Sequence, residues 1–158
     1  MIAITKTTRA TGAKDTLVVL SDTAKLRGLD VERNDRQYLL EQLSSGEQVA
    51  LCDISGRLVM VHKLQDGTRS HRLEMARRAG SAMALRLSAA KRESAQAISL
   101  QDDPEATLAL LEGAVLGAYG FTKYKTGERP RTLGKIGLLA AEVSAPALQG
   151  AMDLCQAV

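Results

Sequence analysis

Residues 112–130 read EGAVLGAYGFTKYKTGERP, and they hold three of the four aromatic side chains of this 158-residue chain. The three are Tyr119, Phe121 and Tyr124, which lie within six residues of one another. Aromatic side chains bury large apolar areas and dominate protein cores and interfaces. Because the chain is so poor in aromatic residues, this concentration predicts that the stretch packs against something specific.

The stretch begins inside a predicted helix and ends in a predicted basic loop. Residues 103–105, Asp-Pro-Glu, are a strong helix start, because Asp caps the first turn, Pro suits the first helical position and Glu faces the positive end of the dipole. An apolar face follows at spacings of 3, 4 and 4, made of Leu108, Leu111, Val115 and Tyr119. Gly117 and Gly120 weaken the last turn, so we expect the helix to end near Tyr119 and residues 123–131 to be exposed.

Strand-like and helix-like segments alternate through the rest of the chain. The predicted strands are residues 2–7, 16–20, 48–52, 57–63, 94–100 and 135–141. The other predicted helices begin at Asn34 or Asp35, at Thr68 or Ser70, and at Ser144, whereas residues 21–30 are expected to form a loop. From residue 57 the order strand, helix, strand, helix, strand, helix favours parallel strands, while the hairpin at 48–63 is antiparallel. The prediction is one α/β domain with a mixed, mostly parallel sheet of about six strands flanked by helices.

The composition is that of a globular protein, with 45% hydrophobic and 25% charged residues. No apolar run approaches the roughly 18 residues of a membrane span, and the first residues lack the apolar core of a signal peptide. A cytoplasmic location without membrane contact is therefore the expectation. Cys52 and Cys155 have no Cys or His near them in sequence, so we expect two buried thiols rather than a metal site or disulfide.

Charged residues fall into three blocks of alternating sign. Residues 69–92 hold seven basic side chains and one acidic one, and residues 93–121 hold five acidic and no basic ones. Residues 122–135 then hold five basic side chains and one acidic one. Alternating blocks predict surfaces that meet one another or a partner, rather than a uniformly basic protein.

Local motifs for catalysis or metal binding are absent from the sequence. There is no phosphate-binding glycine loop and no serine nucleophile motif. His62 and His71 have no carboxylate at ligand spacing, and Asp102-Asp103 precedes a proline as a helix cap would. We therefore predict no catalytic residue and no metal ligand in this chain.

The stretch resembles the helix end and following loop of the N-terminal domain of leucyl (cytosol) aminopeptidases. In that family pattern Glu-Gly opens a helical segment, Leu-Gly-x-Tyr follows, then Phe, Tyr-Lys-Ser/Thr and a basic loop containing proline. The matching residues are Glu112-Gly113, Leu116-Gly117-Ala118-Tyr119, Phe121 and Tyr124-Lys125-Thr126. Gly120 departs from the pattern, because a larger, often charged residue is usual there.

The resemblance implies a macro-domain-like fold for this chain and a parent enzyme of about three times its length. The parent would be a hexameric, cytoplasmic metalloaminopeptidase that removes N-terminal residues from peptides, with two divalent cations, zinc or manganese, activating a water. Its metal-binding motif, Asn-Thr-Asp-Ala-Glu-Gly-Arg, is not in this sequence. Residues 1–158 would then be a single non-catalytic domain, inactive alone, that packs on a catalytic domain and supports assembly of the homohexamer.

Two other functions stay open at this stage. Gly117-Ala118-Tyr119-Gly120 superficially resembles the phosphate loop of macrodomains that bind ADP-ribose, although the helical period places these residues at a helix end. The basic residues of 69–92 and 123–135 could bind nucleic acid, although a solvated helix face is the simpler interpretation.

The resemblance and the periodicity together assign the aromatic stretch to a domain interface. We expect Tyr119 and Phe121 to be buried, and Tyr124 and Lys125 to lie at the edge that faces the catalytic domain. No other site residues are predicted.

Overall fold

The structure, a computed structural model, describes residues 2–123 and 133–157. Six strands form one sheet in the order β1-β6-β5-β2-β4-β3. The strands are β1 (Ala3–Lys6), β2 (Thr16–Leu20), β3 (Ala50–Ile54), β4 (Arg57–Lys63), β5 (Ser94–Leu100) and β6 (Lys135–Leu139). Every pairing is parallel except that of β3 with β4, so the predicted mixed, mostly parallel sheet is confirmed.

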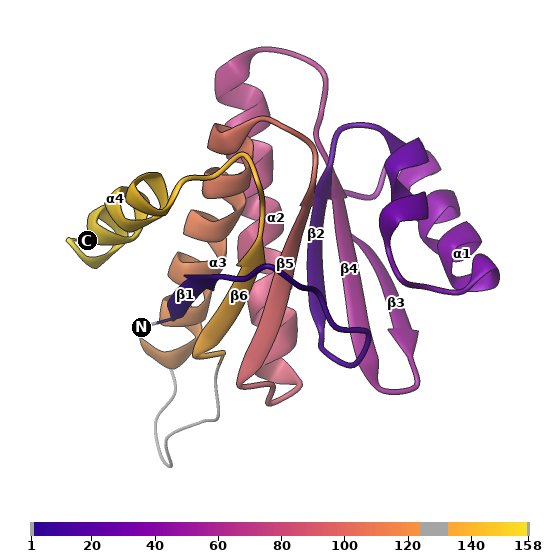
Figure 1. Ribbon diagram of the computed structural model, residues 1–158, viewed down its shortest axis with the longest axis horizontal. Helices are drawn as coiled ribbons and strands as arrows, with labels where there is room; N and C mark the ends of the chain where they lie inside the picture. Colours follow the sequence, from indigo (N-terminus) through magenta and orange to yellow (C-terminus); the bar gives the residue numbers. More distant parts are fainter. Residues whose placement is uncertain (1, 124–132, 158) are drawn as a thin grey trace.

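Helices cover both faces of the sheet. In Figure 1, α2 (Arg69–Ala89) and α3 (Pro104–Lys123) pass behind the strands, and α4 (Ala145–Gln156) lies beside α3. The short 3-10 helix η1 (Thr23–Gly28) and α1 (Arg33–Ser44) cover the opposite face over β2, β4 and β3. The hydrophobic core is accordingly split by the sheet into two clusters.

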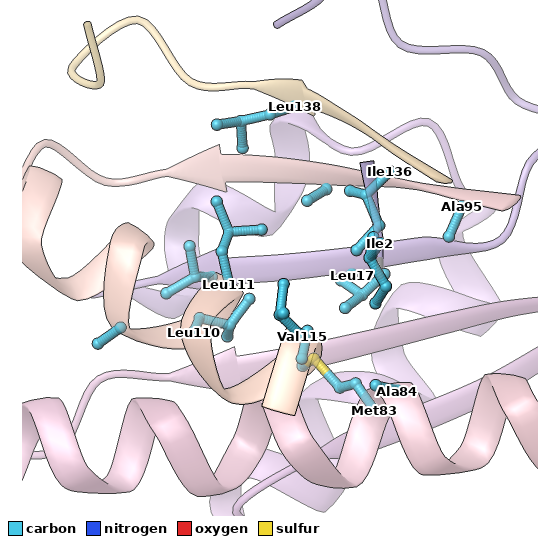
Figure 2. Packing of buried hydrophobic residues seen from close by; sticks show 14 of the residues in the cluster. Ile2, Leu17, Met83, Ala84, Ala95, Leu110, Leu111, Val115, Ile136 and Leu138 are labelled. Atoms are coloured by element: carbon cyan, nitrogen blue, oxygen red, sulfur yellow. The ribbon is translucent and has the colours of Figure 1, made fainter. Parts of the chain in front are cut away.

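The larger cluster lies between the sheet and the α2–α3 pair. Figure 2 shows apolar side chains from the strands and from both helices meeting there. The labelled members are Ile2, Leu17, Met83, Ala84, Ala95, Leu110, Leu111, Val115, Ile136 and Leu138. On α2, residues at spacings of three and four face this cluster, since Ala76, Gly80, Met83 and Leu87 are buried and Leu73 is half-buried.

Glycines bring α2 and α3 into direct backbone contact. A Cβ atom on Gly80 would overlap the carbonyl oxygen of Leu110, and one on Gly113 would overlap the carbonyl oxygen of Arg77. At Gly117 a Cβ atom would lie 2.6 Å from Ser81 Oγ. The helix α3 runs on to Lys123, so the expected end near Tyr119 is wrong. The glycine at 117 serves the contact between helices and does not end α3.

Two further expectations about local structure are corrected. Residues 21–30 are not all loop, because η1 forms with Asp22 Oδ1 accepting a 2.9 Å hydrogen bond from Ala24 N. The helix α1 starts at Arg33 after Glu32, which makes no side-chain cap, so capping by Asn34 or Asp35 is wrong. The start is held instead by the Arg36 side chain, whose guanidinium donates to the carbonyl oxygens of Leu26 and Val31.

The turns and caps elsewhere follow the expected chemistry. Strands β3 and β4 are joined by Ser55 and Gly56, both with positive φ, which matches the twist of a tight hairpin. Gly46 has a φ of 90°, as a residue beyond a helix end requires. Thr68 caps α2 and Ser144 caps α4, each through its side-chain oxygen.

Candidate functional site

The sheet has a topological switch point between β2 and β5. The chain leaves β2 through η1 and α1 on one face, and it leaves β5 through α3 on the other face. These adjacent parallel strands therefore send their connections to opposite sides at their carboxyl ends. In open α/β sheets this geometry opens a crevice, and ligands bind there preferentially.

A cleft of about 630 Å³ lies at this switch point. Residues after β2, β5 and β6 line it together with the η1 segment. They are Ser21, Ala24, Lys25, Arg27, Gly28, Ser99, Leu100, Gln101, Asp102, Ala141 and Glu142. We call this space the outer chamber. Its volume is within the range of about 300–1,000 Å³ that is usual for small-molecule sites.

A smaller cavity of about 180 Å³ adjoins the outer chamber and shares Gly28, Ser99 and Leu100 with it. We call it the inner chamber. Apolar side chains form part of its wall, namely Leu29, Ile98, Leu100 and Leu139. The loop before β2 passes along it, and the Gln96 amide holds this loop by exchanging two hydrogen bonds, of 2.9 and 2.6 Å, with the backbone of Thr11.

A hydrogen-bonded network fixes one wall of the outer chamber. The hydroxyl of Thr107, which is 1% exposed, donates to Glu142 Oε1 at 2.8 Å. Gln101 Nε2 donates to Thr107 Oγ1 at 2.7 Å and to the carbonyl oxygen of Asp103 at 2.8 Å. The loops after β5 and β6 are thus joined through the first turn of α3. The Gln101 and Glu142 side chains are held in place before any ligand arrives.

Sequence reasoning missed both chambers. A usable signal was present, because polar residues directly follow two buried strands, Ser21-Asp22 after β2 and Gln101-Asp102 after β5. The position of these strands next to each other could not be read from the local pattern, so the two polar segments were not connected.

The described residues do not offer a hydrolytic metal centre. Among residues 2–123 and 133–157, no group of three or more His, Cys, Asp or Glu side chains could hold a metal ion. His62 is buried with its Nδ1 2.7 Å from the carbonyl oxygen of Gln48, and His71 is exposed on α2.

The two cysteines are free and buried, as expected. Burial raises the pKa of the Cys52 thiol, and the nearby Asp35 carboxylate raises it further. Burial, followed by Glu112, also raises the pKa of the Cys155 thiol. Raised values favour the protonated thiol, which is the less reactive form.

Of the four predicted interface residues, only Tyr119 has a described side chain. Tyr119 is 57% exposed, so its predicted burial is wrong. The buried side of α3 is set by close contact with α2 through Gly113, Ala114 and Gly117, and this rotates Tyr119 outward. The Phe121 side chain, Tyr124 and Lys125 lie outside the described residues.

Among the described residues, four large apolar side chains are exposed on the three helices that cover one face of the sheet. On α3 they are Leu116, 42% exposed, and Tyr119, one turn further along the helix. Leu85 on α2 and Leu154 on α4 are 41% and 71% exposed. We call these four residues the apolar helix surface.

The alternating charge blocks meet within the molecule. Ion pairs link the basic helix α2 to the acidic block on and before α3, namely Arg69–Glu105, Arg72–Asp103 and Arg77–Glu112. The block at 69–92 is therefore partly neutralised by the chain itself. This weakens the case for nucleic-acid binding, which needs a basic surface free for phosphates.

Comparison with known proteins finds similarity in structure but none in sequence. No family model matches it, and no curated protein matches it in sequence. A mutant of tomato leucine aminopeptidase matches its structure with a TM-score of 0.70 and 14% identity. That match covers 99% of this chain but 36% of the aminopeptidase.

A second match is a cytosol aminopeptidase from Coxiella burnetii, with a TM-score of 0.51 and 15% identity. It covers 97% of this chain and 31% of that protein. This chain therefore spans about a third of the length of the aminopeptidases that it matches. No described helix is long and apolar enough to cross a membrane. The resemblance that rested on residues 112–126 is confirmed at the level of fold: almost the whole chain has the α/β fold of about a third of a leucine aminopeptidase.

Proposed function

We propose that this chain is the non-catalytic N-terminal accessory domain of a leucyl-aminopeptidase-like protein. The observation that carries the proposal is the unequal coverage of the structural match. The match covers nearly all of this chain, whereas about two thirds of the aminopeptidase lies outside the match and would include another domain. The parent would be a cytoplasmic enzyme that removes N-terminal amino acids from peptides.

The two divalent cations of such a parent, zinc or manganese, do not fit the residues described here. Such cations are held by several His, Cys, Asp or Glu side chains that lie close together. The described residues contain no such group. The proposal therefore assigns metal binding and peptide hydrolysis to the catalytic domain. No catalytic step is assigned to this chain.

The work of this domain would be packing and assembly. The apolar helix surface supports this role, because its four exposed apolar side chains lie on helices that contact one another, and exposed apolar area favours association with another protein surface. Its occupant in our proposal is the catalytic domain, with the neighbouring residues Phe121, Tyr124 and Lys125 at the same boundary. Assembly into a homohexamer belongs to the parent protein.

An activity assay tests the absence of chemistry in this chain. The purified chain is incubated with leucine p-nitroanilide and manganese or zinc, and release of p-nitroaniline is followed. We expect no turnover above that of the metal alone. Metal-dependent turnover that survives repeated purification and disappears on heat denaturation would contradict the assignment.

The packing role is tested on the longer protein. Sequencing past the codon for Val158 should find a segment with clustered metal ligands, and that full protein should assemble as a hexamer. Tyr119→Ser is expected to weaken the assembly or the contact between domains, as measured by sedimentation and limited proteolysis. Tyr38→Ser is the matched control, since Tyr38 is 53% exposed on α1, across the sheet from α3. Equal effects of the two substitutions would count against the apolar helix surface as the interface.

A further inference from the structure

The outer chamber has two walls of opposite charge. Lys25 and Arg27 project from the η1 side, whereas Asp102 and Glu142 follow β5 and β6 on the other side. In the part of the chain that the structure describes, none of these four side chains lies within 4.0 Å of an opposite charge. The lining of the cleft therefore carries two cations and two anions that are not paired with one another.

Opposite charges on facing walls select the chemistry of a ligand. A simple anion would be attracted by Lys25 and Arg27 but repelled by the carboxylates, and a simple cation would meet the reverse. A zwitterion satisfies both walls at once. Free amino acids are zwitterions at neutral pH, because their carboxyl group titrates far below pH 7 and their amino group titrates above it.

One anionic wall is already positioned for such a ligand. Glu142 is held by the buried Thr107 hydroxyl through Oε1, and a carboxylate has further lone pairs to accept hydrogen bonds from an ammonium group. Gln101 ties the loop after β5 to the same threonine. A preformed wall lowers the entropy that binding must overcome.

The inner chamber indicates what the ligand's side chain should be. It adjoins the outer chamber at Gly28, Ser99 and Leu100, which line both spaces, and Gly28 has no side chain to stand between them. Leu29, Ile98 and Leu139 supply the apolar part of its wall, and Asp30, Arg57 and Gln96 line it as well. An apolar side chain entering from the outer chamber would be removed from water there, which favours binding.

We propose that the cleft binds a free apolar amino acid as its zwitterion. The carboxylate faces Lys25 and Arg27, the ammonium group faces Asp102 and Glu142, and the side chain enters the inner chamber. This inference rests on the cleft alone. It holds whether or not the chain is an aminopeptidase domain, and it involves no catalytic step.

Matched ligands test the charge requirement on the purified 158-residue chain. Titration calorimetry compares L-leucine with L-leucinamide, which lacks the carboxylate, and with N-acetyl-L-leucine, which lacks the ammonium group. We expect L-leucine to bind and each blocked analogue to bind about tenfold more weakly, the ratio that corresponds to the loss of one charged contact. Amide signals of residues 21–28, 99–102 and 141–142 should shift in NMR spectra on adding L-leucine.

Matched variants locate the site. The double substitution Lys25→Gln with Arg27→Gln, and separately Glu142→Gln, should each weaken L-leucine binding about tenfold. Lys63→Gln removes an exposed charge at the end of β4, outside both chambers, and should leave the affinity unchanged. Circular dichroism on every variant checks that the fold is retained.

Several results would overturn the inference. They are no binding of L-leucine at millimolar concentration, equal binding of the three ligands, and insensitivity to the cleft substitutions. Binding of ADP-ribose that the same substitutions abolish, without binding of L-leucine, would assign the cleft to a nucleotide ligand instead. None of these results bears on the accessory-domain proposal, whose tests are the peptidase assay and the assembly of the longer protein.

Discussion

Individual glycines decide how closely two helices of this protein approach. Gly113 on α3 faces the backbone of Arg77 on α2, and Gly80 on α2 faces the backbone of Leu110 on α3. Backbone atoms cannot move aside as the end of a flexible side chain can. A methyl group at either position must therefore separate the helices.

Gly113→Ala is expected to destabilise the fold by about 3 kcal/mol, the upper part of the range for overpacking a core. The loss should exceed the gain in helix propensity that alanine brings, which is about 0.5–1 kcal/mol. The free energy of unfolding in urea measures the difference. Gly150→Ala is the matched control, because nothing lies within 4 Å of its Cβ position on α4. That control should stabilise, and similar losses for the two variants would contradict the helix contact.

A second residue makes stability depend on pH. His62 is fully buried on β4, and its Nδ1 donates to the carbonyl oxygen of Gln48 in the neutral tautomer that leaves Nε2 unprotonated. Nε2 is buried without a partner in the described structure, so protonation would place a charge in an apolar site. Burial accordingly lowers the pKa of His62 below its ordinary 6.5, although the hydrogen bond to Gln48 opposes this.

The sign of the pH effect follows from this lowered pKa. As pH falls through about 6.5, the unfolded chain takes up a proton at His62 and the folded chain does not. Stability should therefore drop below this pH, by up to about 1.4 kcal/mol for each pH unit, until the folded-state pKa is reached. Urea titrations between pH 7 and pH 5 measure the slope. His62→Gln should flatten the dependence of the unfolding free energy on pH in this range, and His71→Gln should leave it unchanged. An unchanged slope in His62→Gln would show that other groups cause the pH dependence.

At the scale of the elements, one buried carboxylate joins the starts of two strands. Asp15 precedes β2 and is 7% exposed. Its Oδ1 accepts a 2.8 Å hydrogen bond from Leu58 N in β4, and its Oδ2 lies 3.4 Å from Arg92 after α2. The surface pair Arg69–Glu105 joins α2 to α3, with both side chains more than half exposed.

Asp15→Ala should cost about 2 kcal/mol, because it leaves a buried backbone N–H without its partner. Glu105→Ala should cost less than about 1 kcal/mol, since exposed ion pairs contribute little. Thermal and urea unfolding of both variants provide the comparison. A loss for Glu105→Ala equal to that for Asp15→Ala would mean that the ion pairs between the helices carry more stability than their exposure indicates.

The elements themselves were largely predictable from local pattern. The buried strands at 16–20 and 94–100 are continuous or alternating apolar runs, and both have the predicted limits. The end of α3 was not predictable, because Gly117 has the same sequence signature whether it ends a helix or permits a close helix contact. The two roles are distinguished only by the contact with Ser81 of α2, which is close in space but 36 positions earlier in the sequence.

At the scale of the whole molecule, the order of the strands determines the candidate site. Alternating strands and helices predict a parallel sheet, but they do not say on which side of β2 the later strands add. Once β5 pairs with β2, Gln101 and Lys25 lie along one cleft although 76 positions separate them in the chain. The domain interface was predicted from residues 112–126 alone. The exposure of Tyr119 depends on how α3 is rotated against α2, which the spacing of its apolar residues did not fix.

The place of β1 in the sheet has a consequence for the order of folding. Its only strand partner among the described residues is β6, with Ala3 opposite Lys135. As the chain grows on a ribosome, β2, β3 and β4 can pair as soon as residue 63 has emerged, whereas β1, made before them, must wait for residues 135–139. Closing so long a loop is slow compared with local pairing. Of the six described strands, the one made earliest is therefore the last to find its neighbour.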